Sequence, residues 1–475
     1  MKKDIGLRGA SRRDFMRGVF TASAALGLGP TRALDMLEKM GGSALAQAAV
    51  NRSLMVNLIL GNGAMSRATQ LVAVPNAIAT FNAGNTALNP MTTGAAISSR
   101  FTDIKPASGK PHFSRIIDGK PFSEKKPWTV FVSGQSQAHS NFPAFNGNVA
   151  TVTMNGNVSL FSAAAKLQTS LHSLVPAIGI QRGGMSPNYN PASPGSPALS
   201  AVTDQNAMVG LFASAASQLM NRLGDPAHQN LYSQYYTALL GLTRWAGKPT
   251  YSTSAKDAQT ALSLVVQNLG NQLKVQPGQA ATWAGPLVAT DNRMQPVVET
   301  LIVTSNAFKL GLTPHVTFGG FFDDPHGAFA GQPDDLFDGL GRSLDSFQAF
   351  LDTVPDPVVA GKFMGERLVM TISGDTIKNP HQRNGWPDGA PGGANLLYVQ
   401  GAGKLPGGYF GDIMTNARMN WDPATGDLNA AIPTAVCTSA ACGAVLYAVT
   451  GGSTDDVREY YSAPLGATII KPGTT

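Results

Sequence analysis

Acidic and imidazole side chains gather after two apolar segments in the C-terminal half of the sequence. The segment 315–318 runs into Gly-Gly-Phe-Phe-Asp-Asp-Pro-His, and the segment 367–372 runs into Ser-Gly-Asp-Thr. Carboxylate oxygens and imidazole nitrogens on loops are ligands of divalent ions such as zinc, calcium, manganese and magnesium. The candidate metal ligands are Asp323, Asp324, His326, Asp375 and Asp388.

The same residues also have a purely structural interpretation. Asp-Asp-Pro-His is good turn chemistry, and Asp375 is placed to cap the turn that follows it. Under this interpretation the divalent metal is absent. The hydroxyls of Ser136, Ser140 and Thr376 are nucleophile candidates only because they follow predicted strands or flank His139. The catalytic residues therefore stay unknown at this stage.

Strands and helices must position these groups. Apolar runs predict buried strands at 53–60, 128–132, 315–318, 367–372 and 395–399. Apolar residues at helical spacing predict helices at 203–246, 254–274, 296–310 and 334–352, and one more in the 434–462 tail. This order is typical of an α/β fold with a mostly parallel sheet and helices on both faces.

The predicted sheet gives the candidate ligands a common location. In parallel sheets, ligands bind beyond the carboxyl ends of the strands, and the acidic clusters follow such ends. His315 starts its strand, so it is expected at the opposite edge. The proline-rich stretch 184–204 predicts a surface loop. Residues 49–475 are expected to form a single domain with a loop-rich and helical insertion around 66–290.

Charge and composition exclude some classes of protein. Only 13 % of the 475 residues are charged, about half the usual ~25 %. Residues 1–48 hold eight basic and four acidic residues, so they supply +4 of the net +6. The low charged fraction argues against a nucleic-acid binder and against a coiled coil, and because the remainder is nearly neutral, the net charge says little about partners. Polar residues interrupt the low-charge run 428–449, so no membrane span is expected after residue 48.

Residues 1–48 have the order of parts found in a twin-arginine export signal. The stretch Ser-Arg-Arg-Asp-Phe-Met at 11–16 precedes a weakly apolar run at 19–28, which is shorter than the ~20 residues a membrane span needs. Ala-Leu-Ala at 44–46 and Ala-Gln-Ala at 46–48 are candidate cleavage sites. The sequence thus predicts a periplasmic or secreted protein whose partner is the twin-arginine export machinery. The alternative is an amphipathic helix with two chance arginines.

Cys437 and Cys442 are the two cysteines of the chain. Five residues apart in one helix, their Cα atoms would be about 8 Å apart, too far for a disulfide. A disulfide becomes feasible if Cys437 precedes the helix and Ser439 caps it. Two buried thiols are the alternative.

The stretches around the acidic clusters resemble an exported bacterial family known as domain of unknown function 1501, which is similar to the alkaline phosphatase and sulfatase superfamily. Residues 294–311 and 315–321 resemble its helix and the strand that leads into a Gly-Gly-Phe/Trp-Asp-Thr-His motif, here one residue longer. Further matching stretches are 54–65, 367–373, 385–389 and 397–408. The resemblance covers the start of the chain after the signal and residues 294–415.

This resemblance implies an alkaline-phosphatase-like fold and metal-assisted hydrolysis of a phosphate or sulfate ester. His326 and one of the two neighbouring aspartates match the family's His and Asp, and Asp388 stands near a family His. The chain also departs from the pattern, since Met65 falls near a family Asp and Gly374 replaces a Glu, with Asp375 beside it. The resemblance therefore implies one metal or none.

Two functions follow as hypotheses. The first is an exported protein resembling metal-dependent phosphate or sulfate ester hydrolases, with a degenerate metal site. The second is a non-catalytic surface or binding protein that retains the fold. Whether the chain is an enzyme is left open, and the substrate is unknown.

Overall fold

A computed structural model gives the fold of the part of the chain that can be described. The described residues are 52–61, 63–64, 128–134, 157–169, 171, 173, 175–182, 187, 189–212, 269–285, 292–322, 324, 335–357, 359, 361–379, 381, 387–471 and the strand pairs named below between 106 and 150. The chain divides into two compact units, residues 1–48 with 206–274 and residues 49–205 with 275–475. The first contains α10 (Leu269–Leu273), and the second contains the sheet.

An eight-stranded mixed sheet forms the centre of the second unit. Its spatial order is β10 (Ser200–Val202), β9 (Ile178–Ile180), β11 (His315–Phe322), β1 (Leu54–Gly61), β12 (Leu368–Gly374), β13 (Leu396–Gly401), β6 (Trp128–Val132) and β14 (Gly408–Phe410). All strands run in the same direction except β13, which is antiparallel to both of its neighbours. The sheet is thus mostly parallel, as the sequence predicts.

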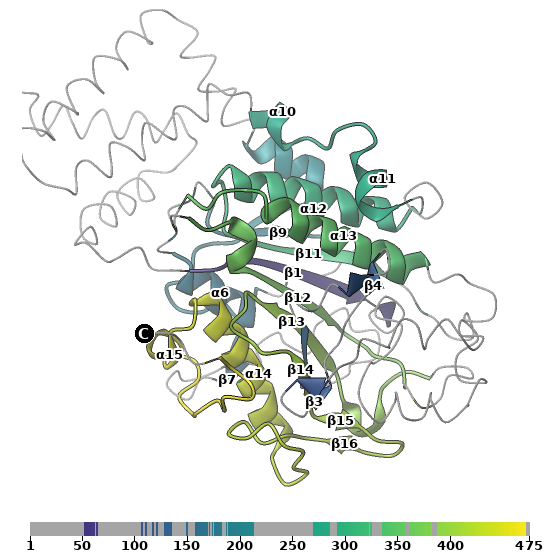
Figure 1. Ribbon diagram of the computed structural model, residues 1–475, viewed down its shortest axis with the longest axis vertical. Coiled ribbons are helices and arrows are strands. Elements are labelled where there is room, and N and C mark those ends of the chain that lie inside the picture. The colour runs from purple at the N-terminus through teal and green to yellow at the C-terminus, as the bar shows by residue number, and fades with distance from the viewer. Residues whose placement is uncertain are drawn as a thin grey trace, which may run out of the picture. The chain divides into compact units, whose positions relative to one another are not determined.

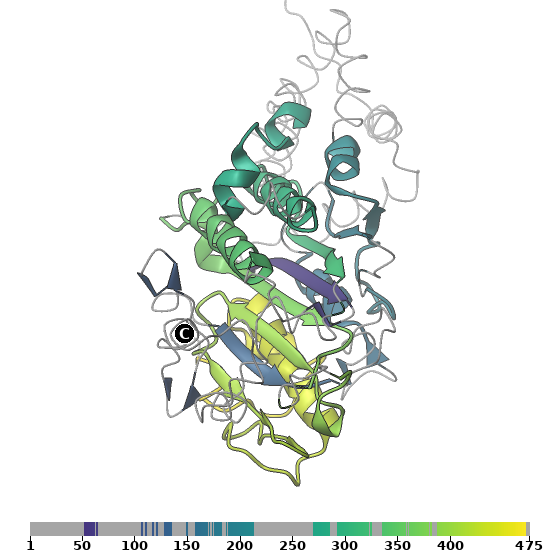
Figure 2. The same cartoon turned by 90° about the vertical axis from the view of Figure 1, so that its right-hand side faces the viewer.

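Helices cover both faces of this sheet (Figures 1 and 2). On one face, α6 (Leu160–Leu167) and α14 (Thr434–Val449) pack against side chains such as Leu397 and Val399 of β13. The next residue along β13, Gln400, points the other way, and its Nε2 donates to Gln348 Oε1 of α13 (Asp335–Leu351) at 2.5 Å. Alternate side chains of a strand face opposite sides. The α13 helix and its neighbour α12 (Met294–Lys309) therefore cover the second face.

The smaller elements lie in the connections. The helices are α11 (Gln279–Ala284), α15 (Thr454–Val457) and the 3-10 turns Met364–Arg367 and Pro391–Gly393. The antiparallel strand pairs are β2 (Pro106–Ala107) with β3 (Lys110–Pro111), β4 (Ile116–Ile117) with β5 (Lys120–Pro121), β7 (Val149–Ala150) with β8 (Asn157–Val158), and β15 (Asp412–Ile413) with β16 (Arg418–Met419).

A buried polar chain holds the three central strands in register. Thr371 Oγ1 of β12 donates to Asn57 Oδ1 of β1 at 2.8 Å, and Asn57 Nδ2 donates to Thr317 Oγ1 of β11 at 2.9 Å. The Thr317 hydroxyl donates in turn to the carbonyl of Pro187 at 3.0 Å. Asn57 lies directly opposite both threonines in the strand pairing. Slipping any strand would leave these buried groups unpaired, so the network fixes the register of the three strands.

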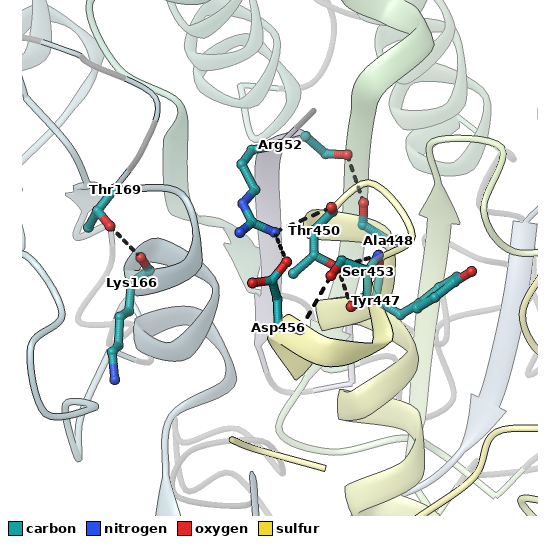
Figure 3. Close-up of polar contacts among 9 residues, drawn as sticks. Arg52, Lys166, Thr169, Tyr447, Ala448, Thr450, Ser453 and Asp456 are labelled. Atoms are coloured by element: carbon teal, nitrogen blue, oxygen red, sulfur yellow. Dashed lines mark hydrogen bonds and ion pairs between the residues drawn. The ribbon is translucent and has the colours of Figure 1, made fainter. Parts of the chain in front are cut away.

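Hydrogen bonds and an ion pair join the start of β1 to the C-terminal end of α14 and to α15 (Figure 3). Arg52 Nη1 donates to Asp456 Oδ2 at 2.9 Å and contacts the Thr450 carbonyl at 3.4 Å. The Ser53 hydroxyl donates to the Ala448 carbonyl at 2.7 Å. These contacts lie at the amino end of the parallel strands, which is the edge opposite the candidate ligands.

One local expectation differs from the structure. The stretch 184–204 is not simply a surface loop, because Tyr189 and Ser193 are buried and residues 200–202 form β10. Its Pro187 carbonyl closes the polar chain described above, so the segment packs onto the sheet. Within residues 66–290, β6 and β9 belong to the sheet, and β6 matches the strand expected at 128–132.

Candidate functional site

The carboxyl ends of β1, β11 and β12 lie side by side at one edge of the sheet. The three strands are neighbours and run parallel, with Gly61 paired to Phe322 and Leu60 paired to Gly374 near their ends. The segments that follow them, which include Gly63, Asp324 and Asp375, are thereby brought to the same edge. This is the position at which parallel sheets bind ligands.

Lys378 is the centre of the polar contacts at this edge. Its Nζ lies 2.6 Å from Asp324 Oδ1 and also forms an ion pair with Asp388 Oδ1. The lysine side chain is 0 % exposed, whereas those of Asp324 and Asp388 are 45 % and 28 % exposed. Two of the candidate ligands therefore do converge, and the cation between them is an ammonium group. We call Lys378, Asp324 and Asp388 the Lys378 cluster.

A short hairpin after β12 holds the lysine in place. Lys378 and Asp388 face each other in an antiparallel bridge. The backbone bonds on either side, from Asn379 N to Pro387 O and from Gly389 N to Ile377 O, are both 3.0 Å long. The pairing of the two backbone segments therefore sets the Lys378–Asp388 contact, while Asp324 reaches it from the end of β11.

Asp375 has a different environment. The residue is 2 % exposed, and Oδ1 accepts a hydrogen bond from the Thr376 backbone N–H at 2.6 Å. The carbonyls of Gly374 and Asp375 accept from Asn395 Nδ2 at 3.1 and 3.3 Å. The bond to Thr376 joins Asp375 to the backbone of the next residue, whereas an Asx turn would reach two residues on.

The other two candidate ligands, Asp323 and His326, lie outside the described residues. Within the described ranges, no three His, Cys, Asp or Glu side chains come together as a metal site would require. The carboxylates of Asp324 and Asp388 do not fit a divalent ion, because both already contact the buried ammonium. A second cation beside it would be repelled by the lysine charge.

The histidines that the structure describes have structural roles. His315 lies at the amino end of β11, as expected, and its Nδ1 donates to Gln168 Oε1 at 2.9 Å, since Gln168 Nε2 donates to the carbonyls of Ser53 and Pro314. Burial lowers the pKa of His315 to about 3, so the ring is neutral. His381 Nε2 donates to the Ile413 carbonyl at 2.6 Å. Ser136, His139 and Ser140 lie outside the described residues.

Both cysteines are buried free thiols. The α14 helix begins at Thr434 and includes both residues, so the arrangement in which Cys437 precedes the helix does not occur. Burial raises the pKa of Cys437, and it raises the pKa of Cys442 to about 12. Neither thiol is activated for chemistry.

Sequence reasoning missed Lys378. Its only signal was a lysine placed between a strand end and a candidate acidic ligand, in a chain with few charges. Its complete burial depends on three separate segments meeting, which no local pattern encodes.

Comparisons with known proteins add no relative. A scan against protein-family models found no matching family, and searches of curated proteins and of solved structures found no matching protein. Among the described residues, no helix has the length and apolar character needed to cross a membrane.

Proposed function

We propose that this chain is an exported relative of metal-dependent phosphate or sulfate ester hydrolases in which a lysine ammonium replaces a metal ion. One observation carries the proposal. A fully buried lysine Nζ bridges Asp324 and Asp388 at the carboxyl edge of a mostly parallel sheet. The sequence pattern predicts both aspartates as metal ligands.

Charge explains why the ammonium suits this position. Buried charges need partners, and two carboxylates on one ammonium leave the cluster at −1. A dinuclear centre would bring about four positive charges and would need several anionic ligands. The chain has Met65 near the position of an Asp, and Gly374 in place of a Glu, in the family that its sequence resembles. These two losses and the gain of Lys378 reduce metal affinity together.

This site is expected to be a weak catalyst or none at all. In metal-dependent ester hydrolysis the ion lowers the pKa of the nucleophile and stabilises charge in the transition state. A lysine fixed by two aspartates can supply part of that positive charge, but it cannot activate a nucleophile as a Lewis acid. The proposal is therefore a degenerate site on a hydrolase-like fold rather than an efficient phosphatase or sulfatase.

Replacing Lys378 by Met tests the proposal. The side chain keeps nearly the same length and loses its charge, which leaves Asp324 and Asp388 without their cation. We expect the wild type to retain only traces of zinc, manganese, calcium or magnesium after dialysis. Lys378→Met is expected to bind one divalent ion per chain at least tenfold more tightly. Lys362→Met, which removes an exposed ion pair with Glu366, is the matched control.

Metal analysis and calorimetric titration give the readout. A wild type that retains tightly bound metal, and loses aryl phosphate or aryl sulfate turnover on chelation, would show an intact hydrolase. If neither the wild type nor Lys378→Met binds metal, the degenerate-site proposal is wrong. The second hypothesis, a binding protein that retains the fold, would then replace it.

A further inference from the structure

Arg418 is a largely buried cation that has no acidic partner among the described residues. Its Nε donates to Asn420 Oδ1 at 2.9 Å, and its two terminal nitrogens donate to the carbonyls of Gly134 and Val132 at 2.6 and 3.3 Å. All three acceptors are neutral. The buried basic residues Arg52, Arg367 and Lys378, by contrast, each form an ion pair with an aspartate.

The charge of Arg418 is not neutralised by its described surroundings. Burial lowers the pKa of Arg418 to about 10, and the titratable neighbour that opposes this shift is Cys437. The pKa of that thiol is itself raised by burial, so it is neutral near pH 7. Arg418 therefore keeps a full positive charge at neutral pH in a poorly solvated position.

Hydrogen-bond capacity remains on this guanidinium. Arginine has five N–H donors, and the three bonds above use three of them, which leaves two. Arg418 is largely but not completely buried, so part of its surface remains open to a ligand. Two N–H groups on one planar cation match an anion that presents two oxygens.

The position of Arg418 supports a ligand-binding role. Gly134 and Val132 mark the carboxyl end of β6, which points to the same edge of the sheet as the ends of β1, β11 and β12. Only β13 separates β6 from β12, so these two ends are about 10 Å apart. Contacts connect them, since His381, three residues after Lys378, bonds to Ile413, which faces Arg418 across the β15–β16 pair.

We propose that Arg418 anchors an oxyanion-binding subsite at the carboxyl end of β6, which takes a phosphate, sulfate or carboxylate group. The backbone carbonyls of Val132 and Gly134 fix the guanidinium plane, and the bound anion supplies the negative charge that the described residues do not provide. This subsite is separate from the Lys378 cluster. It needs no metal, so it can stand or fall independently of the proposed function.

Calorimetric titration of the full chain, depleted of metal, tests the subsite. The probes are sodium phosphate, sodium sulfate and sodium acetate at low millimolar concentration, with sodium chloride at matched ionic strength as the reference. We expect saturable binding of one anion per chain. Comparing the three probes distinguishes a tetrahedral oxyanion from a carboxylate.

Substitutions identify the residue. Arg418→Gln is expected to weaken binding at least tenfold, and Arg418→Lys, which keeps the charge but loses the planar donor pair, by about three- to tenfold. Arg458→Gln removes an exposed arginine next to Asp455 and should change affinity by less than twofold. Wild-type protein that binds none of the three anions, or Arg418→Gln that binds as well as wild type, overturns the proposal. If Arg418→Gln does not fold, the wild-type titration and Arg418→Lys still test the subsite: no wild-type binding, or unchanged binding by Arg418→Lys, overturns it.

Discussion

The side chain of Lys378 passes directly over Gly63. A Cβ atom at position 63 would lie 2.6 Å from Lys378 Cε, closer than folded proteins allow. Gly63 also has φ +83°, a backbone conformation that favours glycine. The turn after β1 and the buried lysine therefore constrain each other. The position of the Lys378 side chain in the Lys378 cluster requires glycine at residue 63.

Replacing Gly63 by Ala should destabilise the protein by two separate effects. The positive φ alone costs about 1 kcal/mol, and the clash with Lys378 should add about 1–3 kcal/mol. Gly403→Ala is the matched control, since Gly403 has φ +74° and an added Cβ there would meet no atom within 4 Å. Urea unfolding measures both variants. Equal losses, or a Gly63→Ala effect unchanged in a Lys378→Ala background, would contradict the contact.

His315 should make the protein less stable in mild acid. Its pKa is about 3 in the folded state against about 6.5 unfolded, so the unfolded chain binds more protons between these values. The contribution of neutral His315 to the free energy of unfolding is therefore complete above pH 6.5, and it decreases as the pH falls below that value. From pH 6.5 to 4.5 the loss should be about 2 kcal/mol, at up to ~1.36 kcal/mol per unit.

The variant His315→Gln isolates this contribution. It should show a much flatter dependence of the unfolding free energy between pH 6.5 and 4.5, whatever its stability at pH 7. Asp456, whose pKa is lowered chiefly by its hydrogen bond from Arg52, loses its contribution only at lower pH. A variant with the same pH slope as wild type would show that His315 is not the group responsible.

The two cysteines should react with a thiol reagent only after unfolding. At pH 8 the buried Cys442, with a pKa of about 12, has almost no thiolate. Protein purified without reductant should give two thiols per chain in denaturant and far less than one in the native state over minutes. Cys437→Ala and Cys442→Ala should each give one. No thiol in denaturant would indicate a disulfide and a different start for α14.

The paired arginines at 12 and 13 should be required for export. Because the twin-arginine machinery recognises the pair, we expect replacing both by lysine to reduce the exported fraction at least tenfold at equal net charge. Arg8→Lys, outside the pair, is the control. Cell fractionation measures the effect, and mass spectrometry of the exported chain should find its first residue at Gln47 or Ala49. Export that survives the double substitution would favour the amphipathic-helix alternative.

The strands and helices next to the candidate site are predictable from apolar patterns. Runs near 54–61, 315–322 and 368–374 form the three strands whose ends meet, because continuous apolar stretches bury both faces of a strand. The direction of β13 was not predicted, although the described part of residues 375–395 contains no α-helix to cross over the sheet. A parallel connection normally needs such a crossover, so a connection without one favours the antiparallel pairing.

The candidate site is only partly predictable. Asp324 and Asp388 stand out because acidic residues follow strands, and both do contact one cation. Their partner was missed because the burial of a lysine depends on packing between distant segments, here the turn at Gly63, the end of β11 and the hairpin after β12. Arg418 was missed for the same reason, since its main acceptors are backbone carbonyls that carry no residue-specific signal.

The hydrogen bonds of Arg52 and Ser53 at the start of β1 have a practical consequence for handling the protein. The Arg52 carbonyl accepts a hydrogen bond from Arg367 at 2.8 Å, and the Ser53 N–H donates to the Val449 carbonyl, also at 2.8 Å. The polypeptide thus enters the described structure at the rim remote from Lys378 and Arg418. A label attached beside Arg52 should therefore leave that far rim accessible, so titrations at both sites need not wait for its removal.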